Sequence, residues 1–262
     1  MSATPIPRTY ALTIYGDMEV SNIKTMPNGR KPVTTLLKKD TEIRQVLDLM
    51  YKELKSNHQV YVIAPLIENG ENTSMENVYE LEEKMNKAFG KLYKVGMLHG
   101  KMSNKEKESV MNDFKDNKIN ILVSTTVIEV GIDVKNATVI AIFDSFRFGL
   151  SALHQLRGRV GRSSLESYCI LISNKETERL DVLTKTTDGF KVSEADFKIR
   201  GSGDIFGIKQ SGDMNFKIAN IKNDFNILLK TKEDSSEFMK KNIEEEEYRH
   251  IKELLAKSIN LD

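Results

Sequence analysis

Short apolar runs alternate with amphipathic helical patterns along the first two thirds of the chain, and this alternation most limits the fold. The runs are rich in Val, Ile and Leu, and they occupy residues 32–37, 59–66, 94–100, 119–126, 137–144 and 167–173. They do not alternate cleanly with polar residues, as is typical of strands buried on both faces of a parallel sheet. The sequence therefore predicts βαβ units in an open α/β sheet, in which ligands gather at the carboxyl ends of the strands.

Helices are predicted between these runs from the spacing of their apolar residues. Residues 41–55 form the first, with Asp40 or Thr41 as the expected cap. Ser103 and Glu106 have the spacing of a capping box that opens another helix. The apolar face predicted for the helix 75–89 consists of Val78, Leu81, Met85, Ala88 and Phe89.

The remainder of the chain, from residue 175 onward, has mostly helical periods, interrupted by a predicted glycine-rich loop at 200–212. No apolar run is long enough to cross a bilayer. Cys169, the single cysteine, lies in an apolar run and is interpreted as a buried thiol in a reducing compartment. The count of cysteines and histidines does not support a metal site.

The segment "STTVIEVGIDV" (124–134) follows a predicted strand. The hydroxyls of Thr125 and Thr126 can reach a phosphate there, and Gly131 permits close approach of the backbone. Asp133 can accept a hydrogen bond from a ribose hydroxyl or hold an arginine. Taken alone, the segment is equally well a strand end followed by a turn.

The segment "HQLRGRVGR" (154–162) holds three arginines and no acid, although the net charge of the whole chain is only +1. A helix is expected to end at Arg157 and to break at Gly158. The planar guanidinium group suits phosphate oxygens, so the segment indicates an anion site. A solvated basic turn is the alternative.

Together with "SATPIPRT" (2–9), these segments resemble, in this order, the third, fifth and sixth motifs in the second motor lobe of superfamily 2 nucleic-acid translocases. Gln155, Gly158, Arg159 and Arg162 fit the sixth motif. The stretches "RFGLSALHQLRGRVGRSSLESYCILIS" and "FKIRGSGDIFGIKQSG" narrow the resemblance to the RecG family of bacterial ATP-dependent DNA helicases, which remodel stalled replication forks. The resemblance implies a RecA-like P-loop NTPase lobe, a parallel sheet flanked by helices, with a C-terminal helical appendage.

The resemblance also implies a nucleotide site shared with a first motor lobe that holds ATP and Mg²⁺. Arg159 and Arg162 would reach the triphosphate, and Gln155 would couple the nucleotide to the lobe interface. Gly131 and Asp133 would line the same cleft.

A DNA-binding role is implied for a second group of residues, namely Thr125, Thr126, His99 and Lys101. From the residues alone, His99 is more simply a loop-packing residue, because no nucleophile or acid is spaced to work with it. Coupling of ATP binding to movement along DNA is implied for Thr4, Arg8, Arg200 and Gln210.

The domains expected are a link from the first lobe (1–30), the helicase lobe (31–174) and a translocation hairpin with C-terminal helices (175–262). The sequence contains no G-x-x-x-x-G-K-[ST] loop. We therefore expect the first lobe and a DNA-wedge domain upstream, and no ATP hydrolysis by this chain alone.

The expected function is DNA repair and recombination on branched or forked double-stranded DNA, in the bacterial cytoplasm near the nucleoid and without a membrane partner. Two alternatives stay open. One is the motor lobe of a transcription-repair coupling factor, which shares "ATPIPRT" and "QLRGRVGR". The other is a non-catalytic nucleic-acid-binding module. The oligomeric state is not predicted.

Overall fold

The computed structural model describes residues 29–65, 71–125, 134–175, 177–205, 225–241, 248–251 and 253. Two compact units divide the chain between Ile199 and Arg200, which places the division within helix α7 (Gly189–Ile205). The predicted boundaries at residues 30 and 174 stay a prediction.

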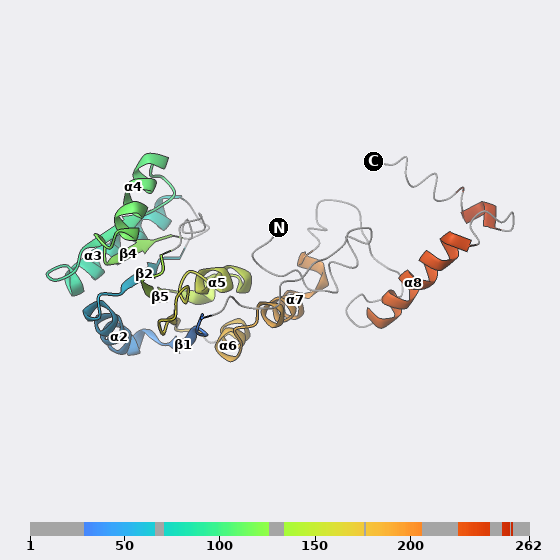
Figure 1. The fold of residues 1–262 in the computed structure, drawn as a ribbon, viewed down its shortest axis with the longest axis horizontal. Coiled ribbons are helices and arrows are strands. Elements are labelled where there is room, and N and C mark those ends of the chain that lie inside the picture. Colours follow the sequence, from blue (N-terminus) through green and yellow to red (C-terminus); the bar gives the residue numbers. More distant parts are fainter. Residues whose placement is uncertain are drawn as a thin grey trace. The chain divides into compact units, whose positions relative to one another are not determined.

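A six-stranded sheet forms the centre of the first unit (Figure 1). Its strands are β1 (Thr34–Lys38), β2 (Gln59–Ile63), β3 (Val95–Leu98), β4 (Ile121–Ser124), β5 (Ala137–Ile142) and β6 (Tyr168–Ile172). They lie in the order β1-β6-β5-β2-β4-β3, and every neighbouring pair is parallel. Each of the six predicted runs coincides with one strand, with β1 ending one residue beyond its run, so the predicted parallel α/β sheet is confirmed.

Helices cover both faces of this sheet, as parallel strands require, because each pair needs a crossover connection. Apolar residues of α2 (Ile43–Lys55) and α3 (Glu71–Phe89) form one core with the strands. Those of α4 (Asn104–Lys115), α5 (Leu150–Arg157) and α6 (Glu178–Lys185) form a second core on the opposite face. Two short 3₁₀ turns, η1 (Asp40–Glu42) and η3 (Ser145–Arg147), complete the first unit's described elements.

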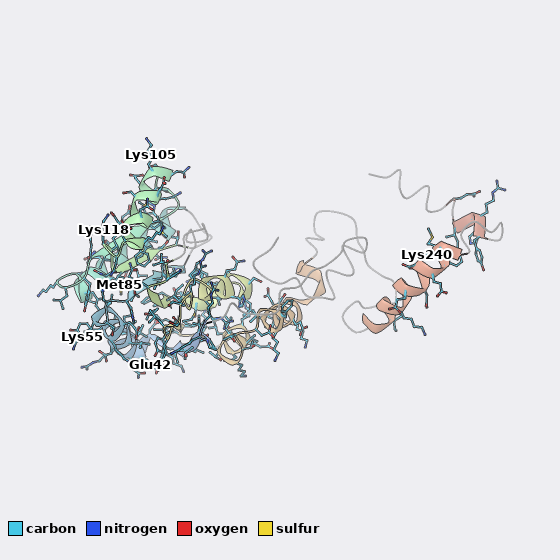
Figure 2. The ribbon with its side chains drawn as sticks, viewed as in Figure 1. Glu42, Lys55, Met85, Lys105, Lys118 and Lys240 are labelled. Carbon is cyan, nitrogen blue, oxygen red and sulfur yellow. The ribbon has the colours of Figure 1, made fainter. Side chains whose placement is uncertain are left out.

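Apolar side chains fill these cores and charged side chains lie on the surface. Met85 is 3% exposed within the α2–α3 core, whereas Lys55, Lys105 and Lys118 extend into solvent (Figure 2). Burying one side chain such as Met85 stabilises the fold by about 1.5–3 kcal/mol. Cys169 is also buried, as predicted, and burial raises the pKa of its thiol to about 12. It is therefore unreactive at neutral pH.

Two expectations about the strands and the first helix are wrong. Only β2, β4 and β5 are buried throughout, and β6 is buried except at its first residue. The strands β1 and β3 are outermost and lack a neighbouring strand on one side. Neither Asp40 nor Thr41 caps the helix by its side chain. The carboxylate of Asp40 instead accepts a hydrogen bond from the Asn174 amide, and Glu42 accepts from the Lys39 N–H at 3.0 Å.

Two further expectations about helices also need correction. Ala88 is exposed on α3, because Met85 and Phe89 already occupy the buried face. The predicted loop at 200–212 does not begin at Arg200, since α7 continues to Ile205. Glycine within a helix costs about 1 kcal/mol relative to alanine, and α7 tolerates that cost.

The capping box predicted at the start of α4 is confirmed. Ser103 is the N-cap, and its Oγ accepts from the Glu106 N–H at 3.3 Å. The Glu106 carboxylate in turn accepts from the Ser103 N–H at 2.8 Å. In the second unit, the described part of the chain contains α8 (Phe225–Lys241), in agreement with the predicted C-terminal helices. No helix among the described residues has the length and apolar character needed to cross a membrane.

Candidate functional site

Helix α5 ends where the arginine-rich segment begins. Leu150, Leu153 and Leu156 anchor the helix in the core, and Gly158 is its C-cap, as predicted. The Gly158 N–H donates to the His154 carbonyl at 3.1 Å, and the Arg159 N–H donates to the Leu156 carbonyl at 3.0 Å. The chain therefore leaves the helix in a tight turn that carries Arg159 and the residues after it.

Gly161 fixes the course of this turn. Its φ of +71° lies in the left-handed region, and a Cβ built at this position would lie 2.5 Å from Val33 Cγ2. Beyond Gly161, Ser163 Oγ donates to the Lys135 carbonyl at 3.0 Å. Val33 precedes β1 and Lys135 precedes β5, so the turn lies at the amino-end edge of the sheet. We call residues 158–163 the arginine turn.

The arginine turn therefore does not lie at the carboxyl ends of the strands, where a sheet of this type is expected to bind its ligands. Helix α5 starts after β5 and runs back antiparallel to the strands, so its last residues reach the opposite edge. The two edges are separated by the strand length, about 20 Å for the six residues of β5.

Arg157 is buried and differs from the other two arginines of the segment. It is 3% exposed, and its Nη1 donates to the carbonyls of Leu183 and Thr186, each at 2.8 Å. Its Nη2 lies 3.0 Å from His154 Nδ1. Burial and the charge of Arg157 lower the pKa of His154 to about 4, so His154 is neutral at pH 7 and Nδ1 accepts the hydrogen bond.

Arg159 and Arg162 are partly exposed at the arginine turn, and so is Gln155 one turn earlier. Arg162 Nε donates to the Gly158 carbonyl at 3.0 Å, which holds the base of its guanidinium group against the end of α5. The structure therefore brings these three predicted residues to the same end of α5. Guanidinium groups only donate hydrogen bonds, so this donor set suits a phosphate anion.

The chain directly after the fifth motif contacts the same turn. Gly131 and Asp133 lie outside the described residues, but Val134 follows them directly and is buried. The hydrogen bond from Ser163 to Lys135 ties the chain just after the motif to the arginine turn. The described part of the chain contains no group of three or more His, Cys, Asp or Glu side chains that could hold a metal ion.

Three of the predicted DNA-binding residues, Thr125, His99 and Lys101, lie at the carboxyl-end edge of the sheet. Thr125 follows β4, and its N–H donates to the Leu98 carbonyl at the end of β3 at 3.3 Å. Thr125 and His99 are both more than nine-tenths buried, and Thr125 Oγ1 and His99 Nδ1 have no hydrogen-bond partner among the described residues. Each such buried polar atom costs about 1–3 kcal/mol.

The loop that carries His99 is held by its neighbours. Lys107 Nζ donates to the Gly100 carbonyl at 2.8 Å, and the Tyr79 ring lies 5.8 Å from the His99 ring. Burial, and then the charge of Lys107, lower the pKa of His99 below its ordinary value, which favours the neutral ring. Lys101 is exposed in the same loop, while Thr126 lies outside the described residues.

The coupling residues are not placed. Thr4, Arg8 and Gln210 lie outside the described residues, and Arg200 is described only as part of α7.

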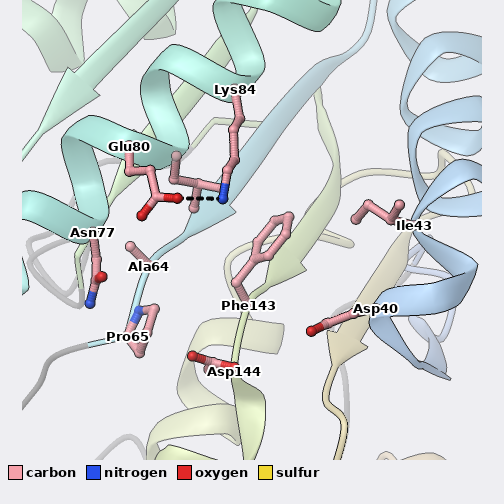
Figure 3. Close-up of a pocket in the computed structure, with 10 residues that line it drawn as sticks. Asp40, Ile43, Ala64, Pro65, Asn77, Glu80, Lys84, Phe143 and Asp144 are labelled. Carbon is pink, nitrogen blue, oxygen red and sulfur yellow. Dashed lines mark ion pairs between the residues drawn. The ribbon is translucent and has the colours of Figure 1, made fainter.

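Sequence reasoning missed a pocket of about 440 Å³ at the carboxyl ends of β2 and β5 (Figure 3). Glu80 and Lys84 extend over it from α3 as an ion pair of 2.7 Å, and Asp40 and Asp144 also line it. No motif marks these residues. The signal was topological, because the connections after β2 and β5 leave toward opposite faces, and such a switch point opens a crevice.

Comparisons with known proteins agree with this geometry. Residues 39–164 match the family model described as helicase conserved C-terminal domain. Residues 186–261 match the model described as ATP-dependent DNA helicase RecG, domain 3, C-terminal. The second match distinguishes RecG from the transcription-repair coupling factor.

Proteins with similar sequences are named ATP-dependent DNA helicase RecG. ATP-dependent DNA helicase RecG of Staphylococcus epidermidis RP62A is 48% identical over 99% of this chain, which covers 39% of that protein. The protein of Staphylococcus aureus NCTC 8325 is 46% identical over 99% of this chain and 38% of its own length. The chain thus spans about two fifths of these relatives.

A solved structure of RecG bound to a three-way DNA junction is 43% identical, with a TM-score of 0.69 over 87% of this chain and 30% of that chain. The sheet, the arginine turn and these matches agree on one assignment. The chain belongs to the RecG family, in which it corresponds to the C-terminal helicase lobe of an ATP-dependent DNA helicase.

Proposed function

We propose that this lobe supplies the arginine side of an ATP site whose phosphate-binding loop and Mg²⁺ belong to a first motor lobe. Arg159 and Arg162 donate to the triphosphate and stabilise the charge that develops on the transferred phosphoryl group. Gln155 lies beside them and links the nucleotide to the lobe interface. Gly131 and Asp133 complete the same side. The observation that carries the proposal is the arginine turn, fixed by Gly161 at one edge of the sheet.

At the opposite edge, Thr125, Thr126, His99 and Lys101 contact the DNA backbone. The support is the pair of buried polar atoms on Thr125 and His99 that lack partners among the described residues. A hydroxyl and a neutral imidazole can each donate to a phosphate oxygen, and the charge of Lys101 adds attraction to the polyanion. Such contacts hold a duplex without reading its sequence.

The longer protein acts as a double-stranded-DNA translocase that remodels stalled forks and recombination intermediates in the bacterial cytoplasm, close to the nucleoid. The relative bound to a three-way DNA junction supports branched DNA as the substrate. Thr4, Arg8, Arg200 and Gln210 couple ATP binding to movement along the duplex, and a wedge domain outside this chain separates the strands.

Arginine substitutions in the full-length protein test this proposal. Arg159→Ala is expected to lower kcat of DNA-stimulated ATP hydrolysis by about 10³-fold or more, because the transition state loses a charge-assisted donor. Arg44→Ala, an exposed arginine on α2, is the matched control and leaves the rate unchanged. Phosphate release on forked DNA gives the rates, and thermal unfolding shows that the fold is kept. A wild-type rate for folded Arg159→Ala overturns the assignment.

A further inference from the structure

Arg157 is a buried cation that forms no ion pair with a carboxylate of the described residues. Its recorded partners are two carbonyls, a hydroxyl and a neutral imidazole: Leu183 O and Thr186 O, each at 2.8 Å, Thr35 Oγ1 at 3.3 Å and His154 Nδ1 at 3.0 Å. Burial lowers the pKa of Arg157, which reflects the cost of removing its charge from water. That cost is several kcal/mol for an ion, and an apolar side chain of similar volume would avoid it.

The end of helix α6 compensates this charge. Leu183 lies in the last turn of α6 and Thr186 is its C-cap, where the carbonyls carry the negative end of the helix dipole. The planar fork of arginine reaches both carbonyls and His154 together, which the compact ammonium of lysine does not. Arg157 therefore fastens the last residue of α5 to the last turn of α6, one residue before the arginine turn.

A second contact holds the other end of α5. Ser151 Oγ donates to Asp196 Oδ2 of α7 at 3.1 Å, and Asp196 is 8% exposed. Helix α5 is thus tied to α7 near its start and to α6 at its end. Its tilt and its end point are set by this helix pair as well as by the sheet.

The hydrogen bond from Arg157 to Thr186 also joins the two regions that match the family models. Arg157 lies within the general helicase match, residues 39–164, and its acceptor Thr186 is the first residue of the RecG-specific match, residues 186–261. The arginine turn and the RecG-specific region therefore meet, within the first unit, at a single buried guanidinium group.

We propose that Arg157 is a positioning residue for the ATPase reaction, which holds Arg159 and Arg162 in register with the α6–α7 pair so that these elements move as one body. The inference rests on the proposed function of Arg159 and Arg162. Without the hydrogen bonds of Arg157, ATP still binds, but Arg159 and Arg162 reach the phosphates in fewer productive geometries. Misplacement by about 1 Å can cost on the order of 10²-fold in rate.

Arg157→Met in the full-length protein tests the proposal, since methionine fills the volume without a charge. We expect kcat of DNA-stimulated ATP hydrolysis to fall about tenfold to 10²-fold, with KM for ATP changed less than about threefold. The thermal midpoint stays close to wild type, because a buried ion replaced by an apolar group is often neutral for stability. Unchanged kcat in folded Arg157→Met overturns the proposal.

Ser151→Ala removes the hydrogen bond from α5 to Asp196 of α7 at little risk to folding. If Arg157→Met does not fold, this variant tests the proposal instead. It is expected to lower the number of base pairs unwound per ATP at least about twofold. The matched control is Thr184→Ala on α6, whose hydroxyl donates to the Asp181 carbonyl of the same helix. If Ser151→Ala unwinds as many base pairs per ATP as Thr184→Ala, the proposal is overturned.

Arg159→Ala, measured in parallel, distinguishes a failure of the proposed function from a failure of the positioning role of Arg157. If Arg159→Ala keeps the wild-type rate, the proposed function fails and the positioning role of Arg157 fails with it. If Arg159→Ala loses the rate while folded Arg157→Met keeps it, only the positioning role fails.

Discussion

Gly161 is a single residue that fixes the course of the arginine turn. Its positive φ and the 2.5 Å approach of Val33 to the position of a Cβ both require glycine. Gly158, four residues before Arg162, has an ordinary helical φ of −67° and a nearest contact of 3.3 Å. The two glycines of the motif therefore have different tasks, one ending a helix and one allowing a close approach.

Gly161→Ala is accordingly expected to lower the free energy of unfolding by about 1–3 kcal/mol, since the new side chain is strained and displaces Val33. Gly158→Ala serves as the control, with a cost below about 1 kcal/mol. Chemical denaturation of both variants measures the difference. Equal stabilities of the two variants would contradict the argument from Gly161.

Among the elements, α4 sets the geometry of the loop of His99. The capping box of Ser103 and Glu106 starts the helix directly after the loop, and Lys107 reaches back to the Gly100 carbonyl. Helix α5 has the corresponding task at the other edge, because its direction carries Arg159 and Arg162 away from the carboxyl ends. The loop of His99 connects β3 to α4 and the arginine turn connects α5 to β6, so two different βαβ connections supply the residues at the two edges of the sheet.

Ser103→Ala is expected to cost about 1 kcal/mol of unfolding free energy, because the Glu106 N–H loses its acceptor and the first turn of α4 frays. Ser56→Ala, at the C-cap of α2, is the control: the Ser56 hydroxyl donates to the exposed Lys52 carbonyl, so a loss of a few tenths of a kcal/mol is expected. Urea unfolding tests the ranking, and the reverse order would refute it.

At the scale of the whole molecule, the proposed function gives the lobe two functional edges and one side of a nucleotide site. The arginine turn and the loop of His99 lie at opposite ends of the strands, so in this proposal ATP and DNA approach the lobe from different sides. The sheet between the two edges packs against an apolar core on each face, which makes it a rigid connection.

The chain by itself is expected to show no ATP turnover, since it holds the arginines but its sequence contains no phosphate-cradling G-x-x-x-x-G-K-[ST] loop. Phosphate release by the purified chain, with and without forked DNA, measures this. Turnover that disappears in Arg162→Ala would contradict the expectation, because the signal would then belong to this chain and not to a contaminant.

The sequence by itself determined the sheet, the alternation of helices and the family, because apolar periodicity and ordered motifs are local properties of the chain. It also predicted that α5 ends at Arg157. The resemblance assigned a role to Arg159 and Arg162 and none to Arg157, and it did not predict that Arg157 is buried, since the three side chains share one chemistry. Only the tertiary structure decided that Arg157 turns inward to α6 and that the arginine turn lies at the amino-end edge. Both outcomes depend on packing between segments far apart in the sequence, such as Val33 against Gly161 and Thr186 against Arg157.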